Sequence, residues 1–88
     1  MEIQKIIITG GATRIGAAIA ESLANDKNQI TIHYNKSKEK AEKLKKNLER
    51  KGSRIFLIKA NLNKIFELNK IIRFANLKMK GINCLINN

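Results

Sequence analysis

The chain has 88 residues and a formal net charge of +11, with 43% hydrophobic residues and 5% aromatic residues. This length allows one domain with a modest core, and the hydrophobic content argues against disorder. Positive charge attracts nucleic acids, acidic membranes and phosphorylated ligands. Nucleic-acid binding is disfavoured, because the basic residues are not interleaved with stacking aromatics and because the richness in lysine, isoleucine and asparagine is typical of an AT-rich genome.

The sequence has one cysteine, Cys84, which excludes an intramolecular disulfide. No Cys/His cluster has metal-ligand spacing, so no metal site is predicted. The N-terminus lacks the zones of a signal peptide, and no apolar run approaches the roughly 20 residues of a membrane span. We therefore expect a cytoplasmic protein without a membrane partner, in which Cys84 is a small buried hydrophobic residue on a strand.

Apolar, β-branched runs alternate with helical patterns along the chain. Strands are expected over Ile3–Thr9, Gln29–Tyr34, Ile55–Ile58 and Ile82–Asn88, and helices over Arg14–Asn25, Lys38–Lys51 and a segment from Asn63 to Gly81. Strands separated by helices indicate parallel strands joined by right-handed crossovers. The sequence thus predicts an α/β fold, a Rossmann-type open parallel sheet with strand order 3-2-1-4, over residues 1–88.

The expected helices differ in their apolar faces. The first carries Ile15, Ala18, Ile19 and Leu23 at helical spacing, and the second, capped by Ser37 and closed by Gly52, has a thin stripe of Ala41, Leu44 and Leu48. The third, capped by Asn63 and ended by Gly81, is expected to bury Ile65, Leu68, Ile71, Ile72, Ala75 and Leu77 or Met79.

A glycine-containing turn reads Thr-Gly-Gly-Ala-Thr-Arg-Ile-Gly from Thr9 to Gly16. A strand, a turn and a helix N-terminus meet there, which favours binding of a phosphate. A Walker loop is excluded, because Ala17 and Ala18 stand where a lysine and a hydroxyl residue are needed, and the G-x-G-x-x-G spacing is absent. A strand-to-helix turn without a ligand is the alternative.

The pattern Thr-Gly-x-x-x-Arg-Ile-Gly resembles the glycine turn of the short-chain dehydrogenases and reductases, with Arg14 in place of the middle glycine. Ala60-Asn61-Leu62 resembles the family's Ala-Asp-Leu, and Asn87-Asn88 resembles the start of its Asn-Asn-Ala-Gly segment. The resemblance implies that Asn61 and the backbone N–H of Leu62 meet adenine, although an amide replaces the family's aspartate. It places Asn87 and Asn88 beside the nicotinamide ribose.

The choice of dinucleotide depends on the end of the second strand, where an acidic residue favours NAD and a basic one favours NADP. No acid lies between Asp26 and Glu39. Arg-Ile-Gly together with His-Tyr-x-Lys-Ser looks like the pteridine reductase branch, in which Arg14, Asn35, Lys36 and Ser37 would surround the 2′-phosphate. We expect His33 to pack or hydrogen-bond near the strand end. The expected NADP(H) site comprises Thr9, Gly10, Arg14, Ile15, Gly16, Asn35, Lys36, Ser37, Asn61, Leu62, Asn87 and Asn88.

The resemblance implies an NADPH-dependent reductase of dihydropteridines or dihydrofolate. A 3-oxoacyl carrier-protein reductase and a non-catalytic nucleotide-binding or interaction module are the alternatives. The family's proton-donating tyrosine has a lysine four residues later, a spacing that Tyr34 and Lys38 match by chance on the adenosine side. We expect residues 1–88 to be the cofactor-binding half, with no catalytic residue and no activity alone. A small-molecule substrate would need a full-length form, and the open edge of the last strand would favour self-association.

Overall fold

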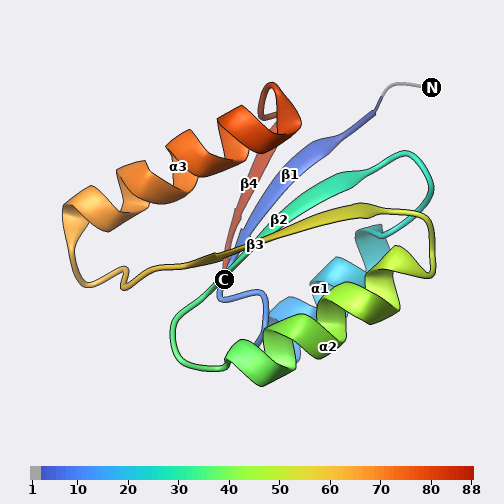
Figure 1. Ribbon diagram of the computed structural model, residues 1–88, viewed down its shortest axis with the longest axis horizontal. Coiled ribbons are helices and arrows are strands. Elements are labelled where there is room, and N and C mark those ends of the chain that lie inside the picture. The colour runs from blue at the N-terminus through green and yellow to red at the C-terminus, as the bar shows by residue number, and fades with distance from the viewer. Residues whose placement is uncertain (1–2) are drawn as a thin grey trace.

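The structure is a computed structural model that describes residues 3–88 (Figure 1). Its elements are β1 (Lys5–Thr9), α1 (Arg14–Leu23), β2 (Gln29–Tyr34), α2 (Lys38–Glu49), β3 (Arg54–Lys59), α3 (Ile65–Met79) and β4 (Cys84–Asn87). All strand pairs are parallel and the order is β3-β2-β1-β4, so the predicted sheet is confirmed. Within the described residues, no helix has the length and apolar composition needed to cross a membrane.

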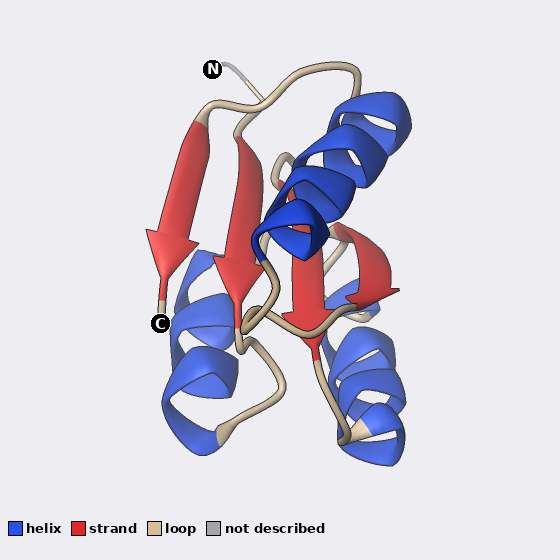
Figure 2. Ribbon diagram, turned by 90° about the vertical axis from the view of Figure 1, so that its left-hand side faces the viewer, coloured by secondary structure: helices blue, strands red, loops and turns tan. Residues whose placement is uncertain are grey.

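The strands are in a register that brings their carboxyl ends to one edge of the sheet. Thr9 pairs with Asn87, and Tyr34 pairs with Lys59. The helices α1 and α2 cover one face of the sheet and α3 lies on the other (Figure 2). The turn that follows β1 therefore lies beside the ends of β2 and β4.

The face beneath α1 and α2 holds the larger core cluster. Leu44 and Leu48 of α2 pack there with residues from three strands and from α1, namely Ile6, Ile8, Ala20, Ile30, Ile32 and Ile55. The predicted stripe of α2 is confirmed, because Ala41 is buried as well. In α1 the prediction of an apolar face through Ile15 is wrong, since that side chain is 68% exposed. Ala18 is exposed too, but the predicted Ile19 and Leu23 pack against this core, next to the buried Gly16 and Ala20.

The opposite face is covered by α3 through a narrow row of side chains. Ile71, Ala75 and Met79, four residues apart, pack against Ile7 and Ala60. The wider buried face expected for this helix is wrong, because Ile65, Leu68, Ile72 and Leu77 are exposed. A helix that lies alone on a sheet buries the one row that faces it, and its flanks remain in water.

Several predicted element ends differ from the structure. The first strand begins at Lys5, the first helix ends at Leu23, and α3 begins after Lys64 rather than after an Asn63 cap. The N–H of Asn63 instead donates to Asn61 Oδ1 at 3.0 Å. Asn63 thus belongs to a local turn that competes with capping.

Four further expectations concern single residues. Ser37 occupies the N-cap position of α2, but its side chain makes no cap hydrogen bond. Gly52 follows α2 with a positive φ of 95°, as helix-ending glycines do, whereas α3 is ended by Lys80, which takes the left-handed conformation with a φ of 58° one residue before Gly81. Cys84 is exposed and not buried, because β4 has a strand neighbour on one side only.

Candidate functional site

The turn between β1 and α1 is held by its own polar groups. Gly10 has a φ of 61°, a conformation that favours glycine. Its carbonyl accepts from the N–H of Thr13 at 3.1 Å and from the Thr13 hydroxyl at 2.8 Å. The same hydroxyl caps α1 by accepting from the N–H of Gly16 at 3.3 Å. The turn is therefore closed before any ligand arrives.

Gly16 has no room for a side chain. A Cβ at this position would contact the carbonyl oxygen of Gly10 and would lie 2.7 Å from the Cα of Gly11 and 2.9 Å from Nδ2 of Asn88. Two of these neighbours are backbone atoms, which cannot move without opening the turn. Glycine at the first turn of α1 thus lets the helix start directly against β1.

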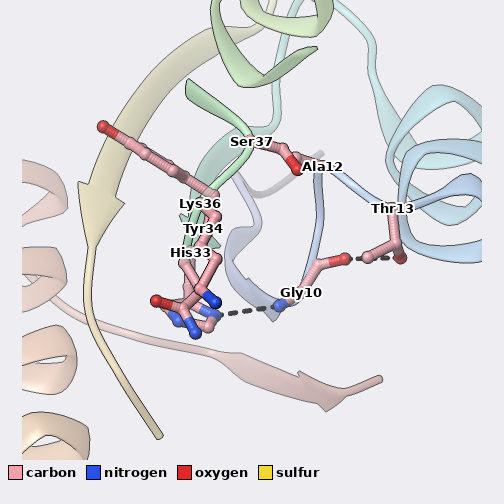
Figure 3. A pocket seen from close by; sticks show the side chains of 8 residues that line it. Gly10, Ala12, Thr13, His33, Tyr34, Lys36 and Ser37 are labelled. Atoms are coloured by element: carbon pink, nitrogen blue, oxygen red, sulfur yellow. Dashed lines mark hydrogen bonds between the residues drawn. The ribbon is translucent and has the colours of Figure 1, made fainter. Parts of the chain in front are cut away.

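His33 joins the ends of three strands. The ring is 4% exposed, and its Nδ1 accepts from the N–H of Gly10 at 2.9 Å (Figure 3). Its Nε2 lies 2.7 Å from the carbonyl oxygen of Ala60, and its own carbonyl accepts from the N–H of Gly11 at 3.0 Å. Because Nδ1 must accept and Nε2 must donate, these partners assign the neutral ring with its hydrogen on Nε2. The expectation for His33 is confirmed.

The end of β4 is tied to the same turn. The hydroxyl of Thr9 lies 3.2 Å from Oδ1 of Asn87 and accepts from the N–H of Asn88 at 3.1 Å. The side-chain amide of Asn88 donates to the carbonyl of Gly10 and to the hydroxyl of Thr13, both at 3.0 Å. Thr9 is buried, and its hydroxyl holds the ends of β1 and β4 together.

A cavity of about 350 Å³ lies between this turn and the end of β2 (Figure 3). It brings three predicted residues, Asn35, Lys36 and Ser37, to Gly10. The remaining lining residues are Ala12, Thr13, His33 and Tyr34. An amide, an ammonium and a hydroxyl thus face the glycine turn without a carboxylate among them.

Arg14 lies in an adjoining cavity of about 360 Å³ between α1 and α2. The two cavities share Ala12 and Thr13, so they meet at the glycine turn. The cavity of Arg14 is also lined by Lys40 and Lys43. Within residues 3–88 the one ion pair joins Lys70 to Glu67 at 3.9 Å. The cations around the turn therefore form no ion pair with a carboxylate in this part of the chain.

The other predicted residues lie around these cavities. Leu62 and Asn87 line an apolar hollow of about 290 Å³ beside α3 and β4. Asn61 follows β3, where its N–H donates to Oε1 of Glu67 at 3.2 Å and its Oδ1 accepts from the N–H of Asn63. The exposed Ile15 lies on the outer side of α1.

Sequence reasoning missed three residues of this region. Thr13 precedes a helix and is a preferred N-cap residue, so its capping role had a signal. Lys40 and Lys43 are three residues apart, a spacing that places them on one helix face. The bonds of His33 had no sequence signal, because they depend on how three strand ends meet.

Comparison with known proteins gives this arrangement a context. A family model described as short chain dehydrogenase matches residues 4–88. The 3-oxoacyl-acyl-carrier-protein reductase FabG of Staphylococcus epidermidis is 32% identical over 82 residues, which are 93% of this chain and 34% of that protein. The chain therefore spans about a third of the length of this relative.

Solved structures of the same kind superimpose closely. A short-chain dehydrogenase from Oenococcus oeni PSU-1 has a TM-score of 0.92 at 30% identity and covers 98% of this chain and 40% of its own. A short-chain dehydrogenase from Burkholderia cenocepacia J2315 in complex with NADP has a TM-score of 0.92 at 31% identity, over 99% of this chain and 36% of that one.

Proposed function

The chain belongs to the short-chain dehydrogenase family, and on that premise we propose that it is the NADPH-binding part of a short-chain reductase. The observation that carries this proposal is the cavity between the glycine turn and Asn35–Ser37, whose lining includes an ammonium, a hydroxyl and an amide and no acid. The NADP complex of a structural relative that is 31% identical supports it.

The residues present fit the adenosine half of such a cofactor. Gly10 permits the tight turn and the close approach of a diphosphate to the backbone, and Gly16 lets α1 start against that turn. Lys36, Ser37 and Asn35 supply an ammonium, a hydroxyl and an amide at the end of β2, the groups that a 2′-phosphate needs. Arg14 adds a guanidinium from the adjoining cavity.

The remaining predicted contacts lie farther along the sheet edge. Asn61 still has an unused lone pair on Oδ1, which can accept from the amino group of adenine while Asn63 occupies the other. The backbone N–H of Leu62 would meet adenine as well, and Asn87 and Asn88 would border the nicotinamide side of the cofactor. NADPH, when bound, supplies a hydride. These residues bind and orient it.

Two substrate classes are proposed, each on its own observation. The FabG relative, 32% identical, favours a 3-oxoacyl thioester on a carrier protein. The Arg-Ile-Gly turn and the His-Tyr-x-Lys-Ser segment favour a dihydropteridine or dihydrofolate. Both are reduced by hydride from NADPH, so the cofactor site serves either class.

A non-catalytic nucleotide-binding module is the second candidate function. The sequence has one tyrosine, Tyr34, and this residue lines the adenosine cavity at the end of β2. Its side chain therefore lies on the wrong side of the proposed cofactor to protonate a substrate. Steady oxidation of NADPH by the purified 88-residue chain, with an oxoacyl thioester or a dihydropteridine, would overturn this candidate.

Isothermal titration of the chain with NADPH and NADH tests the proposal. The two cofactors differ by one phosphate, which would gain charge-assisted hydrogen bonds from Lys36 and Ser37. We expect NADPH to bind roughly tenfold more tightly or better. Lys36→Gln should reduce the difference in affinity between NADPH and NADH by weakening NADPH binding, and it should leave NADH binding unchanged. Equal or tighter binding of NADH would contradict the assignment.

A further inference from the structure

Two lysines of α2 face the cofactor region from a cavity that the sequence analysis did not consider. Lys40 and Lys43 line the cavity of Arg14 together with Asn47 and Leu44. Its walls thus carry three cations and an amide, with no carboxylate among them. Like charges gathered in one concave site repel one another, and an anion placed between them relieves that repulsion.

Lys40 also links this cavity to the end of β2. It lines a further hollow of about 380 Å³ together with Lys36 and Ser37. Those two residues in turn line the cavity of the glycine turn. Lys40 therefore lines one cavity with Arg14 and another with Lys36. Glu39 lines the further hollow as well, but no ion pair joins it to either lysine in the described residues.

We propose that Lys40 is a specificity-determining residue that places its ammonium against the 2′-phosphate of the bound cofactor, with Lys43 as a weaker second cation. This inference rests on the proposed NADPH function. In the bound state the phosphate would lie between Arg14 of α1 and Lys36 of the β2–α2 loop, and Lys40 would approach it from the first turn of α2, the helix that follows this loop. A lysine is suited to this position, because its long flexible stem carries a point charge to the phosphate.

The experiment uses two nucleotides that differ in the 2′-phosphate alone. Adenosine 2′,5′-bisphosphate and adenosine 5′-monophosphate are titrated into the 88-residue chain and into its Lys40→Gln, Lys43→Gln and Lys46→Gln variants. Lys46 is an exposed lysine of the same helix that lines none of these hollows, so its variant removes the same charge elsewhere. Lys40→Arg restores the charge.

We expect Lys40→Gln to weaken binding of the bisphosphate roughly tenfold, the loss of one partly solvated charge-assisted contact. Lys43→Gln should weaken it about threefold and Lys46→Gln less than twofold, because screening reduces the effect of distant charges. Binding of the monophosphate should not change, and Lys40→Arg should retain most of the affinity. Thermal unfolding without nucleotide shows that each variant is folded.

Two results separate this inference from the function on which it rests. If the bisphosphate binds more tightly than the monophosphate and Lys40→Gln has no larger effect than Lys46→Gln, the role of Lys40 is overturned and the proposed function stands. If the unchanged chain binds neither nucleotide, both are overturned. Equal weakening of both nucleotides by Lys40→Gln also contradicts the inference, because the lysine would then act away from the 2′-phosphate.

Discussion

The two faces of the sheet differ in how completely they are covered. Beneath α1 and α2, the side chains of β1 and β2 are buried and the surrounding hollows are lined by cations and amides. On the other face α3 lies alone, and its Ile65, Phe66 and Leu77 are each more than 60% exposed. The predicted cofactor site thus lies beside the face of the sheet that is covered by two helices, α1 and α2.

This difference has a physical basis in what a phosphate site requires. A turn that binds an anion must hold its N–H groups in place before the ligand arrives, since ordering them afterwards would weaken binding. The Gly10 turn is held by Thr13, His33 and Asn88 from three directions.

The largest expected effect is a loss of stability caused by a substitution in the core beneath α1 and α2. Leu48 is fully buried between α2 and the sheet. We expect Leu48→Ala to lower the free energy of unfolding by about 3 kcal/mol, because it removes buried methyl groups and leaves a cavity. Urea denaturation measures this change, with the exposed neighbour variant Glu49→Ala as the control, expected within about 0.5 kcal/mol. A loss below 1 kcal/mol would mean that this face is not tightly packed.

A smaller effect is expected at the junction of the strand ends. His33→Leu leaves the N–H of Gly10 and the carbonyl of Ala60 without partners, which costs about 2 kcal/mol of stability. The variant should also weaken NADPH binding, because the turn loses a support. His33→Asn keeps an acceptor near Nδ1 and should recover part of both losses. If leucine and asparagine behave alike in the NADPH titration, the bond to Gly10 does not position the turn.

The smallest effect on stability is expected on the α3 face. Ile65 is 87% exposed, so Ile65→Ser should change the free energy of unfolding by less than about 0.5 kcal/mol. Removing exposed apolar area should lower self-association, which sedimentation velocity measures. Asn69→Ser, an exposed polar change on the same helix, serves as the control. A large loss of stability would show that Ile65 packs against protein.

Patterns local to the chain predicted much of the fold. β-branched runs around Ile7 and Ile30 and the glycines of the turn determine strands and their connections, so the order of the sheet followed from general crossover rules. The stripe of α2 was also predictable, because Ala41, Leu44 and Leu48 are nearly its only apolar residues. Because α2 has one narrow apolar face and is otherwise polar, it can pack against the sheet in one orientation only.

Burial and side-chain partners could not be predicted in the same way. Helix α3 is apolar on several sides, and only the sheet beneath it selects Ile71, Ala75 and Met79. The cavity that Arg14 shares with Lys40 and Lys43 of α2 could not be predicted from the sequence either. Such placements depend on helix-to-helix packing, which no local pattern encodes.

The central claim is that the α1 and α2 face binds the adenosine half of NADPH, and amide chemical shifts of the isotopically labelled chain during an NADPH titration test it most directly. The account predicts that the largest shifts occur from Gly10 to Gly16 and from Asn35 to Lys40, while Ile71 to Met79 of α3 stay in place. Shifts concentrated on α3, or no shifts at millimolar NADPH, would contradict it.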